Sequence, residues 1–140
     1  MIRHKTGFAL LGSILISAGT TGCASPSPQE AVERRFDTYM NAWVKRDIDG
    51  IWNAMSPRLK QGNGNSKKVY RKFVEEQNIY FLRYSRRETK MDGSRAYVIA
   101  DMTITDSAKT EIVEERQRCD LVHHKGSWYI DDCKPLNPPV

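Results

Sequence analysis

The sequence predicts an α+β domain in which N-terminal helices pack on a curved, four-stranded antiparallel sheet. Apolar residues recur every three or four positions over residues 28–77, which is the period of amphipathic helices. From Ile79 onward the apolar residues alternate with polar ones, which is the period of strands. Turn signals at Asp92-Gly93 and Lys125-Gly126 divide this second half. A run of helices followed by a run of strands is typical of helices that cover one face of a sheet.

The helices have recognisable first residues. Ser27-Pro28-Gln29-Glu30 has the form of a capping box and begins an amphipathic helix that ends before Asp47. Asp47 or Asp49 caps a second, shorter helix, which we expect Ser56-Pro57 to end or bend. Ser66 caps a third helix that ends near Gln77.

The strands follow as a meander. We expect them at residues 79–91, 94–105, 110–123 and 128–133. In the second strand one face is apolar, and the other face carries Tyr97, Ile99, Asp101 and Thr103. The members of the apolar face are Ala96, Val98, Ala100, Met102 and Ile104. Residues 135–140 are rich in proline and are expected to form a tail without regular structure.

Size and charge limit the function classes. The chain has 140 residues, enough for one domain. It carries 22 Lys and Arg residues against 17 Asp and Glu residues, and two of the bases, Arg3 and Lys5, precede an apolar run near the N-terminus. The remainder is only mildly basic, so we expect no nucleic-acid partner.

Residues 1–22 have the layout of a secretory signal peptide. Arg3 and Lys5 precede an uncharged apolar run that ends at Gly22. The run is interrupted by glycine and serine, and it is shorter than the ~20 apolar residues of a transmembrane helix. An uncleaved membrane anchor is the alternative interpretation.

Thr20-Thr21-Gly22-Cys23 resembles the lipobox of bacterial lipoproteins, with Thr20 where leucine is usual. The resemblance implies cleavage before Cys23, lipidation of Cys23 and acylation of the new N-terminus by fatty acids such as palmitate. Several acyl chains anchor a protein stably in a lipid bilayer. Residues 23–27 would then be a lipidated N-terminus with a short tether, and Ala24 favours the outer membrane, facing the periplasm. The alternative is an ordinary signal peptide followed by an unpaired Cys23.

Cys119 and Cys133 are the other two cysteines, and in an oxidising compartment we expect them to pair. A two-residue turn at Lys125-Gly126 would place Cys119 opposite Asp132. A three-residue loop would place it opposite Cys133, and Val122 opposite Ile130. We therefore predict the longer loop or a bulge, with a cross-strand disulfide.

Residues 28–134 resemble the nuclear-transport-factor-2-like superfamily. The resemblance rests on the order and spacing of three segments, Lys45–Trp52, Arg95–Asp101 and Gly126–Asp132. It implies a cone-shaped fold whose members include isomerases, dehydratases, transport adaptors and protein-binding domains. The Gly-x-Trp-x-Ile ending is frequent in small secreted members without known enzyme activity. Sheets of this superfamily often pair back to back, so the resemblance makes a homodimer through the sheet one expectation, although the sequence alone does not fix the oligomeric state.

Three groups of residues are candidates for a site. Asp101 would be a general base with Tyr39 as a donor to an oxyanion, or else Tyr39 lies in the core and Asp101 on the solvent face. Trp43, Trp52 and Trp128, with Tyr97, would line an apolar cavity or fill the core. His123 and His124 point to opposite faces of a strand, so we expect no metal and no other cofactor. No catalytic residues are assigned.

Basic side chains form a candidate surface for anionic lipid headgroups or an acidic partner, although a solvated face is the alternative. They are Lys67, Lys68, Arg71, Lys72, Arg83, Arg86 and Arg87. The function predicted from the sequence is a membrane-anchored envelope lipoprotein that acts as a non-enzymatic protein-binding or accessory module. The alternatives are a binder of small apolar ligands and an enzyme of isomerase or dehydratase type.

Overall fold

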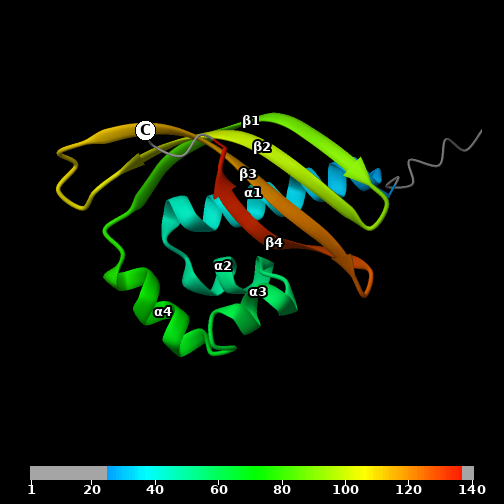
Figure 1. The fold of residues 1–140 in the computed structure, drawn as a ribbon, viewed down its shortest axis with the longest axis horizontal. Helices are drawn as coiled ribbons and strands as arrows, with labels where there is room; N and C mark the ends of the chain where they lie inside the picture. The colour runs from blue at the N-terminus through cyan, green and yellow to red at the C-terminus, as the bar shows by residue number, and fades with distance from the viewer. Residues whose placement is uncertain (1–24, 137–140) are drawn as a thin grey trace, which may run out of the picture.

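A computed structural model describes residues 25–136 and shows helices on one face of a curved sheet (Figure 1). Residues 1–22, for which a signal peptide is predicted, as well as Cys23 and residues 137–140, lie outside the described residues. Within residues 25–136 no helix is long and apolar enough to cross a membrane. The elements are α1 (Pro28–Lys45), α2 (Ile48–Ala54), α3 (Pro57–Gly62), α4 (Lys67–Glu76), β1 (Tyr80–Asp92), β2 (Arg95–Thr105), β3 (Ile112–His124) and β4 (Ser127–Pro135).

Three of the helices begin at the caps that the sequence predicts. The Ser27 hydroxyl accepts a hydrogen bond from the Glu30 amide at 3.2 Å, and the Asp47 carboxylate accepts one from the Gly50 amide at 3.1 Å. Ser66 caps α4 in the same way. Each cap satisfies an amide that has no partner within the helix.

The helix α3 corrects the expectation at Ser56-Pro57. These residues do not simply end or bend the chain; they begin a new short helix. The Ser56 hydroxyl accepts a hydrogen bond from the Leu59 amide at 3.0 Å, and Pro57 occupies the first turn, where its missing amide hydrogen costs nothing.

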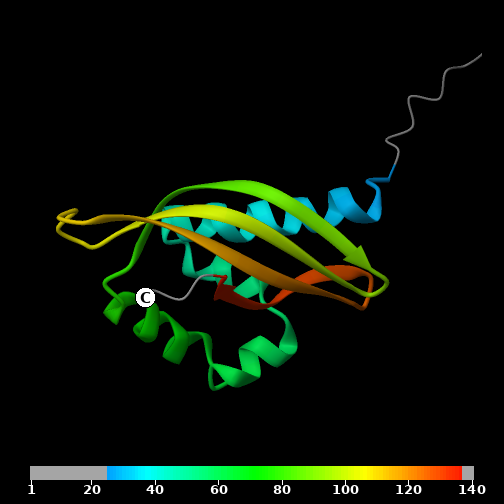
Figure 2. The ribbon, with the colours of Figure 1, turned by 45° about the horizontal axis from the view of Figure 1, so that its top comes forward.

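The sheet is an antiparallel meander in the order β1-β2-β3-β4, as predicted. Its strands lie within two residues of their expected limits. In β1 the register shifts at Leu82 and again at Arg87, where one extra residue bulges from the strand. Bulges increase twist and bend a strand, and the long strands curve over α1 in both ribbon views (Figure 2). The predicted fold class is confirmed.

The core lies between α1 and the concave face of the sheet. The predicted apolar face of β2 is buried from Ala96 to Met102, and Ile104 is half-buried. Residues of α1, α2 and β4 pack against it, including Val32, Phe36, Met40, Ile51 and Ile130, all at most 1% exposed. This packing removes the largest apolar side chains from water and supplies the main driving force for folding.

Cys119 and Cys133 form a disulfide across β3 and β4, with their Cα atoms 4.1 Å apart. The predicted bulge is confirmed: Leu121 pairs with Ile130 and Asp120 with Asp132, so that Asp131 is the extra residue. The longer loop is wrong, because Lys125 and Gly126 form a two-residue turn with φ of 47° and 82°. Positive φ at both positions suits the twist of a tight hairpin. Val122 consequently faces Tyr129 and not Ile130.

Candidate binding site at the open end of the cone

An apolar pocket of about 230 Å³ opens between the C-terminal half of α1, the end of α4 and the sheet. We call it the mouth pocket. Its lining residues come from four parts of the chain that are distant in the sequence. They are Tyr39, Met40, Trp43, Phe73, Gln77, Ile79, Phe81, Gln117 and Cys133.

Aromatic contacts between α1 and β1 build the floor of the mouth pocket. Tyr39 and Trp43 lie one helical turn apart on α1, and their ring centroids are 6.3 Å apart in an edge-to-face arrangement. The Trp43 ring also packs on Phe81 of β1 at 5.4 Å. Such aromatic pairs stabilise a fold by about 0.5–1.5 kcal/mol beyond their burial. The floor is therefore a packed surface rather than a loose loop.

Arg46 holds α4 and the start of β1 beside α1. It ends α1 in a left-handed conformation with φ of 52°. Its guanidinium donates hydrogen bonds to the carbonyl oxygens of Val74 and Ile79, both at 2.8 Å, and lies 4.2 Å from the centre of the Tyr80 ring. The sequence analysis missed Arg46, because its partners lie 28 and 33 residues away and no local pattern connects them.

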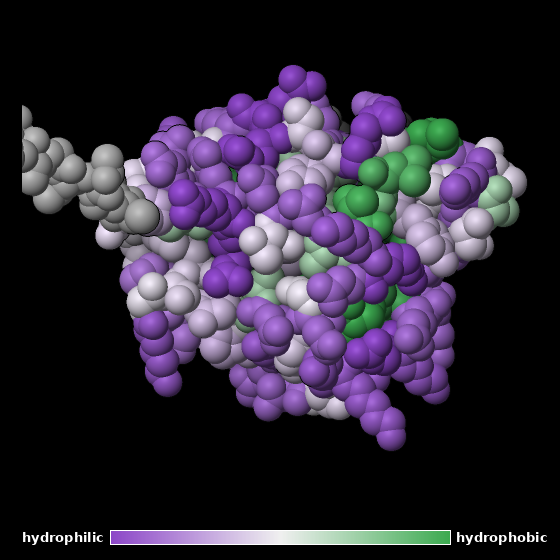
Figure 3. Space-filling view, turned by 180° about the vertical axis from the view of Figure 1, so that it is seen from behind, coloured by the Kyte–Doolittle hydropathy of each residue, from purple (hydrophilic) through white to green (hydrophobic). Residues whose placement is uncertain are grey.

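Exposed apolar side chains continue from the mouth pocket to the surface. We call Phe73, Ile79 and Val113 the apolar rim; they are 49%, 43% and 45% exposed. Val113 belongs to a cross-strand row, because Phe81 pairs with Ile104 and Ile104 pairs with Val113. Figure 3 shows a hydrophobic band on one side of the molecule amid a largely hydrophilic surface. Contiguous apolar surface of this kind marks a binding site more often than scattered single residues do.

The lining of the mouth pocket offers little for acid–base chemistry. Burial raises the pKa of the Tyr39 phenol to about 12, so the phenol stays neutral at physiological pH. Cys133 is oxidised in the disulfide. Among the described lining residues, the other polar side-chain groups are the indole N–H of Trp43 and the amides of Gln77 and Gln117. The arrangement suits an apolar group with one or two hydrogen-bonding atoms.

Comparison with known proteins identifies the fold. No protein-family model matches the sequence, and no curated protein matches it. A SEC-C motif-containing protein from Rhodopseudomonas palustris superposes with a TM-score of 0.57 at 19% identity, covering 79% of this chain and 80% of that one. A ketosteroid isomerase-like protein from Erwinia carotovora atroseptica gives 0.57 at 15% identity, with 81% and 100% covered. A protein of unknown function from Shewanella oneidensis, described as nuclear-transport-factor-2-like, gives 0.57 at 12% identity, with 78% and 98% covered. The chain has the nuclear-transport-factor-2-like fold.

The nuclear-transport-factor-2-like fold does not decide whether this chain is catalytic. An epoxide hydrolase from Mycobacterium tuberculosis also superposes, with a TM-score of 0.53 at 16% identity and 76% and 86% coverage. Solved structures with this fold thus include an enzyme as well as a protein of unknown function. Function must be argued from the site.

Asp101 lies outside the nuclear-transport-factor-2-like cone. Its neighbours Ala100 and Met102 are buried on the concave face, so Asp101 points to the convex face. There it accepts hydrogen bonds from Arg116 at 2.7 Å and from Arg87 at 2.6 Å, which lower its pKa to about 2. Of the two alternatives drawn from the sequence, the structure therefore agrees with the second, in which Tyr39 lies in the core and Asp101 on the outer face. An ionised carboxylate on the outer face does not adjoin a phenol inside the cone.

The structure separates the candidate ligand residues. Tyr39 and Trp43 line the mouth pocket. Trp52 packs on Tyr70 between α2 and α4, and Trp128 is 8% exposed near the opposite end of the cone. Tyr97 lies on the convex face, 4.0 Å beneath the Arg118 guanidinium. These residues do not line one cavity. The three tryptophans instead pack in or against the core, which was the other alternative, and Tyr97 faces the opposite side of the sheet.

The residues of the predicted basic surface are also separated in the structure, into bases of α4 and bases of β1. The α4 bases Lys67 and Arg71 pair with Asp49, at 2.9 and 3.6 Å. Arg86 points to the concave side, where it pairs with acids of α1. Arg83 and Arg87 pair with other acids, Glu114 and Asp101. In Figure 1 β1 begins beside the end of α4 and then runs away from it along the sheet. Lys67, Lys68, Arg71 and Lys72 therefore form no single surface with Arg83, Arg86 and Arg87. The bases of α4 and the bases of β1 are near one another in the sequence, but in the fold they face different surroundings.

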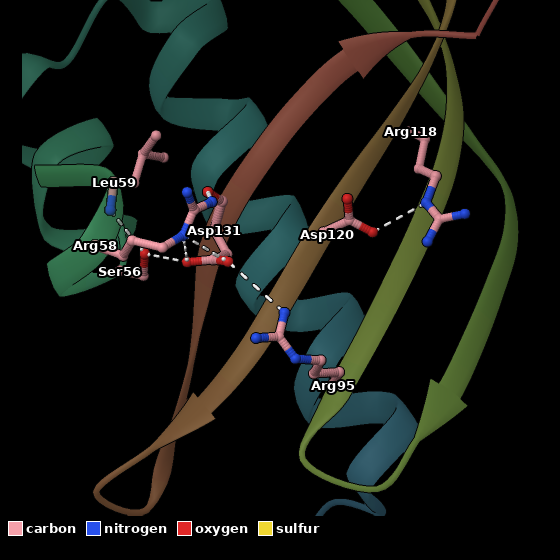
Figure 4. Close-up of polar contacts among 7 residues, drawn as sticks. All are labelled: Ser56, Arg58, Leu59, Arg95, Arg118, Asp120 and Asp131. Atoms are coloured by element: carbon pink, nitrogen blue, oxygen red, sulfur yellow. Dashed lines mark hydrogen bonds and ion pairs between the residues drawn. The ribbon is translucent and has the colours of Figure 1, made fainter. Parts of the chain in front are cut away.

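A second polar cluster lies where α3 meets β4 (Figure 4). The Asp131 side chain accepts hydrogen bonds from the Ser56 hydroxyl at 2.7 Å and from Arg58 Nε at 3.1 Å, and Arg95 lies 3.9 Å away. The Ser56 amide donates to the Ile130 carbonyl at 2.7 Å. The cluster holds α3 against β4. Within residues 25–136 it is not part of any group of three or more metal-ligating side chains.

Proposed function

We propose that this protein is a lipid-anchored, non-enzymatic binding domain of the bacterial cell envelope. Its mouth pocket and apolar rim receive apolar side chains of a protein partner. The observation that carries the proposal is the combination, at one end of the cone, of an apolar pocket and exposed large apolar residues, without a charged group in the lining. Burial of such a surface against a partner lowers the free energy of the system. The same surface offers no acid or base for a reaction.

The size of the mouth pocket favours side chains of a partner over a free small molecule. Its volume is about 230 Å³, whereas ligand sites usually enclose about 300–1,000 Å³. The pocket also continues into the exposed rim and does not close over an occupant. A partner would place one or two side chains in the pocket and cover Phe73 and Ile79 with its own surface.

The anchor is supported by the sequence of the N-terminus and by the disulfide. Thr20–Cys23 resembles a lipobox, and the preceding residues have the layout of a signal peptide. A disulfide between Cys119 and Cys133 suits an oxidising compartment such as the periplasm. Acylated Cys23 would hold the domain at the membrane.

Photo-crosslinking in living cells tests partner binding. A photoreactive phenylalanine analogue replaces Phe73 in the full chain, and the matched control carries it at Lys68, which is exposed on the same helix. We expect one adduct from position 73 that disappears when Ile79→Asp places a charge in the rim. Adducts of equal yield from position 68, or none from position 73, would contradict partner binding at the mouth.

A further inference from the structure

Two β-turns and the first turn of α1 lie together at the end of the cone opposite the mouth pocket (Figures 1 and 2). Pro26 and Pro28 line a surface hollow together with Gly93 of the β1–β2 turn and Gly126 of the β3–β4 turn. We call this region the tether end. Since α1 has 18 residues and an α-helix rises 1.5 Å per residue, its two ends are about 27 Å apart.

The tether end must lie close to the membrane if Cys23 is acylated, and the inference therefore rests on the proposed function. Pro28 lies five positions after Cys23, and a fully extended chain spans at most about 3.4 Å per residue. The first turn of α1 then lies within about 17 Å of the lipidated residue. The mouth pocket at the other end of α1 has no such constraint.

Basic side chains dominate the tether end. The exposed bases are Arg34, Lys90, Arg95 and Lys125, against the exposed acids Glu30 and Asp92. Among the less exposed residues, Arg35 is a further base, and Glu33 and Asp131 are acids that pair with Arg86 and Arg95. Arg34 and Arg35 line a second hollow with Pro26 and Gly126. Among the ion pairs of the described residues, Arg95 takes part in one, with Asp131, and remains largely exposed. In the β2–β3 turn, at the mouth end, acidic residues outnumber basic ones: Asp106 and Glu111 lie on either side of Lys109 in the sequence.

We propose that the tether end binds anionic phospholipid headgroups and so fixes the orientation of the domain, with the mouth pocket facing away from the bilayer. A basic side chain near an anionic bilayer increases binding by about fivefold. Few such charges suffice, because the acyl chains already keep the domain at a high effective concentration beside the headgroups. This orientation leaves the apolar rim open to a partner in the aqueous space.

Hydrogen exchange on vesicles tests the orientation. The full lipidated protein is reconstituted in phosphatidylethanolamine with phosphatidylglycerol, and separately in phosphatidylethanolamine with phosphatidylcholine. We expect amides at residues 92–93 and 125–126 to exchange at least about fivefold more slowly on the anionic vesicles. The protection should disappear in about 1 M salt, where the screening length falls to about 3 Å.

Matched charge reversals locate the surface. Arg34→Glu with Lys125→Glu should abolish the protection, whereas Lys68→Glu with Lys109→Glu makes the same charge change away from the tether end and should preserve it. Equal exchange at the turns on both kinds of vesicle, or lipid-dependent protection of α4 or the apolar rim instead, would overturn the proposal.

The intact mass, measured before the exchange experiment, separates this inference from the proposed function. A chain that is unacylated at Cys23 and does not remain on the vesicles overturns both. A chain that is acylated and vesicle-bound, but whose turns are not protected, overturns the orientation and leaves the anchored binding domain standing.

Discussion

At the scale of single residues, Asp131 carries the clearest energetic role outside the core. It is 6% exposed, and it is the bulged residue that the sequence pattern does not distinguish from Asp132. Burial alone would raise the pKa of Asp131, but hydrogen bonds from Arg58 and Ser56 outweigh burial and keep that pKa below its usual value. The folded state therefore stabilises the charged carboxylate.

Asp131→Asn should lower the free energy of unfolding by about 1–3 kcal/mol, because a buried, charge-assisted hydrogen-bond network loses its negative charge and one of its two acceptor oxygens. Asp132→Asn makes the same charge change at the neighbouring, half-buried position and should have little effect. Urea unfolding of the two variants at neutral pH provides the comparison. Equal stability of the two variants would show that the contact between α3 and β4 contributes nothing measurable.

The same carboxylate makes stability depend on pH. A pKa that is lower in the folded than in the unfolded state gives stabilisation that is fully present above the unfolded value, about 3.9 for aspartate, and is lost as pH falls through the folded value. Unfolding free energy should therefore fall below about pH 4. Asp131→Asn should show a smaller fall than the wild type in urea titrations between neutral pH and about pH 3. An unchanged acid slope in the variant would assign the dependence to other groups.

At the scale of elements, the periodicity of the sequence was sufficient for the helices and strands, but it was not sufficient for their contacts. Caps such as Ser27 and Asp47 are local signals, and they were found. A bulge in the last hairpin was predicted from Cys119 and Cys133, but not its position at Asp131. The contacts of Arg46 depend on partners far along the chain, which periodicity does not encode. Asp101 was assigned to the correct strand face, but only the structure identified its two arginine partners.

The disulfide should stabilise the pairing of β3 with β4. Cys119 and Cys133 are 14 residues apart, and in the chain-entropy model a loop of this size contributes about 3 kcal/mol. Replacing both cysteines by alanine should lower the free energy of unfolding by that amount, and reduction of the wild type should reproduce the loss. If thermal midpoints of the oxidised and reduced proteins coincide, the bond is not a stabilising element.

Arg46 should control the position of α4 and hence the mouth pocket. Arg46→Lys keeps the charge but cannot make both hydrogen bonds and cover Tyr80. We expect faster hydrogen exchange in α4, with the sheet unchanged, and a loss of about 1.5–3 kcal/mol because the hydrogen bonds involve a charged donor. Arg34→Lys, an exposed position on the same helix, is the control. Equal exchange in both variants would contradict this role.

At the scale of the whole molecule, the two ends of the cone differ in chemistry. One end carries the mouth pocket and the apolar rim, and the other carries the basic tether end. The sequence predicted the fold and an anchor, but it could not locate a site, because Phe73 and Ile79 meet Tyr39, Trp43 and Gln117 in one pocket only when α1, α4 and the strands assemble. A homodimer through the sheet stays a prediction; its interface would have to accommodate charged residues such as Arg87, Asp101 and Arg116 on the convex face.

Mass spectrometry of the protein extracted from the membrane fraction of the producing cell tests the anchored binding domain most directly. We predict that the chain begins at Cys23 and carries a diacylglyceryl thioether and an acylated amino group on that residue. A chain that retains residues 1–22, or that begins with an unmodified N-terminus, would contradict the anchor on which the function rests.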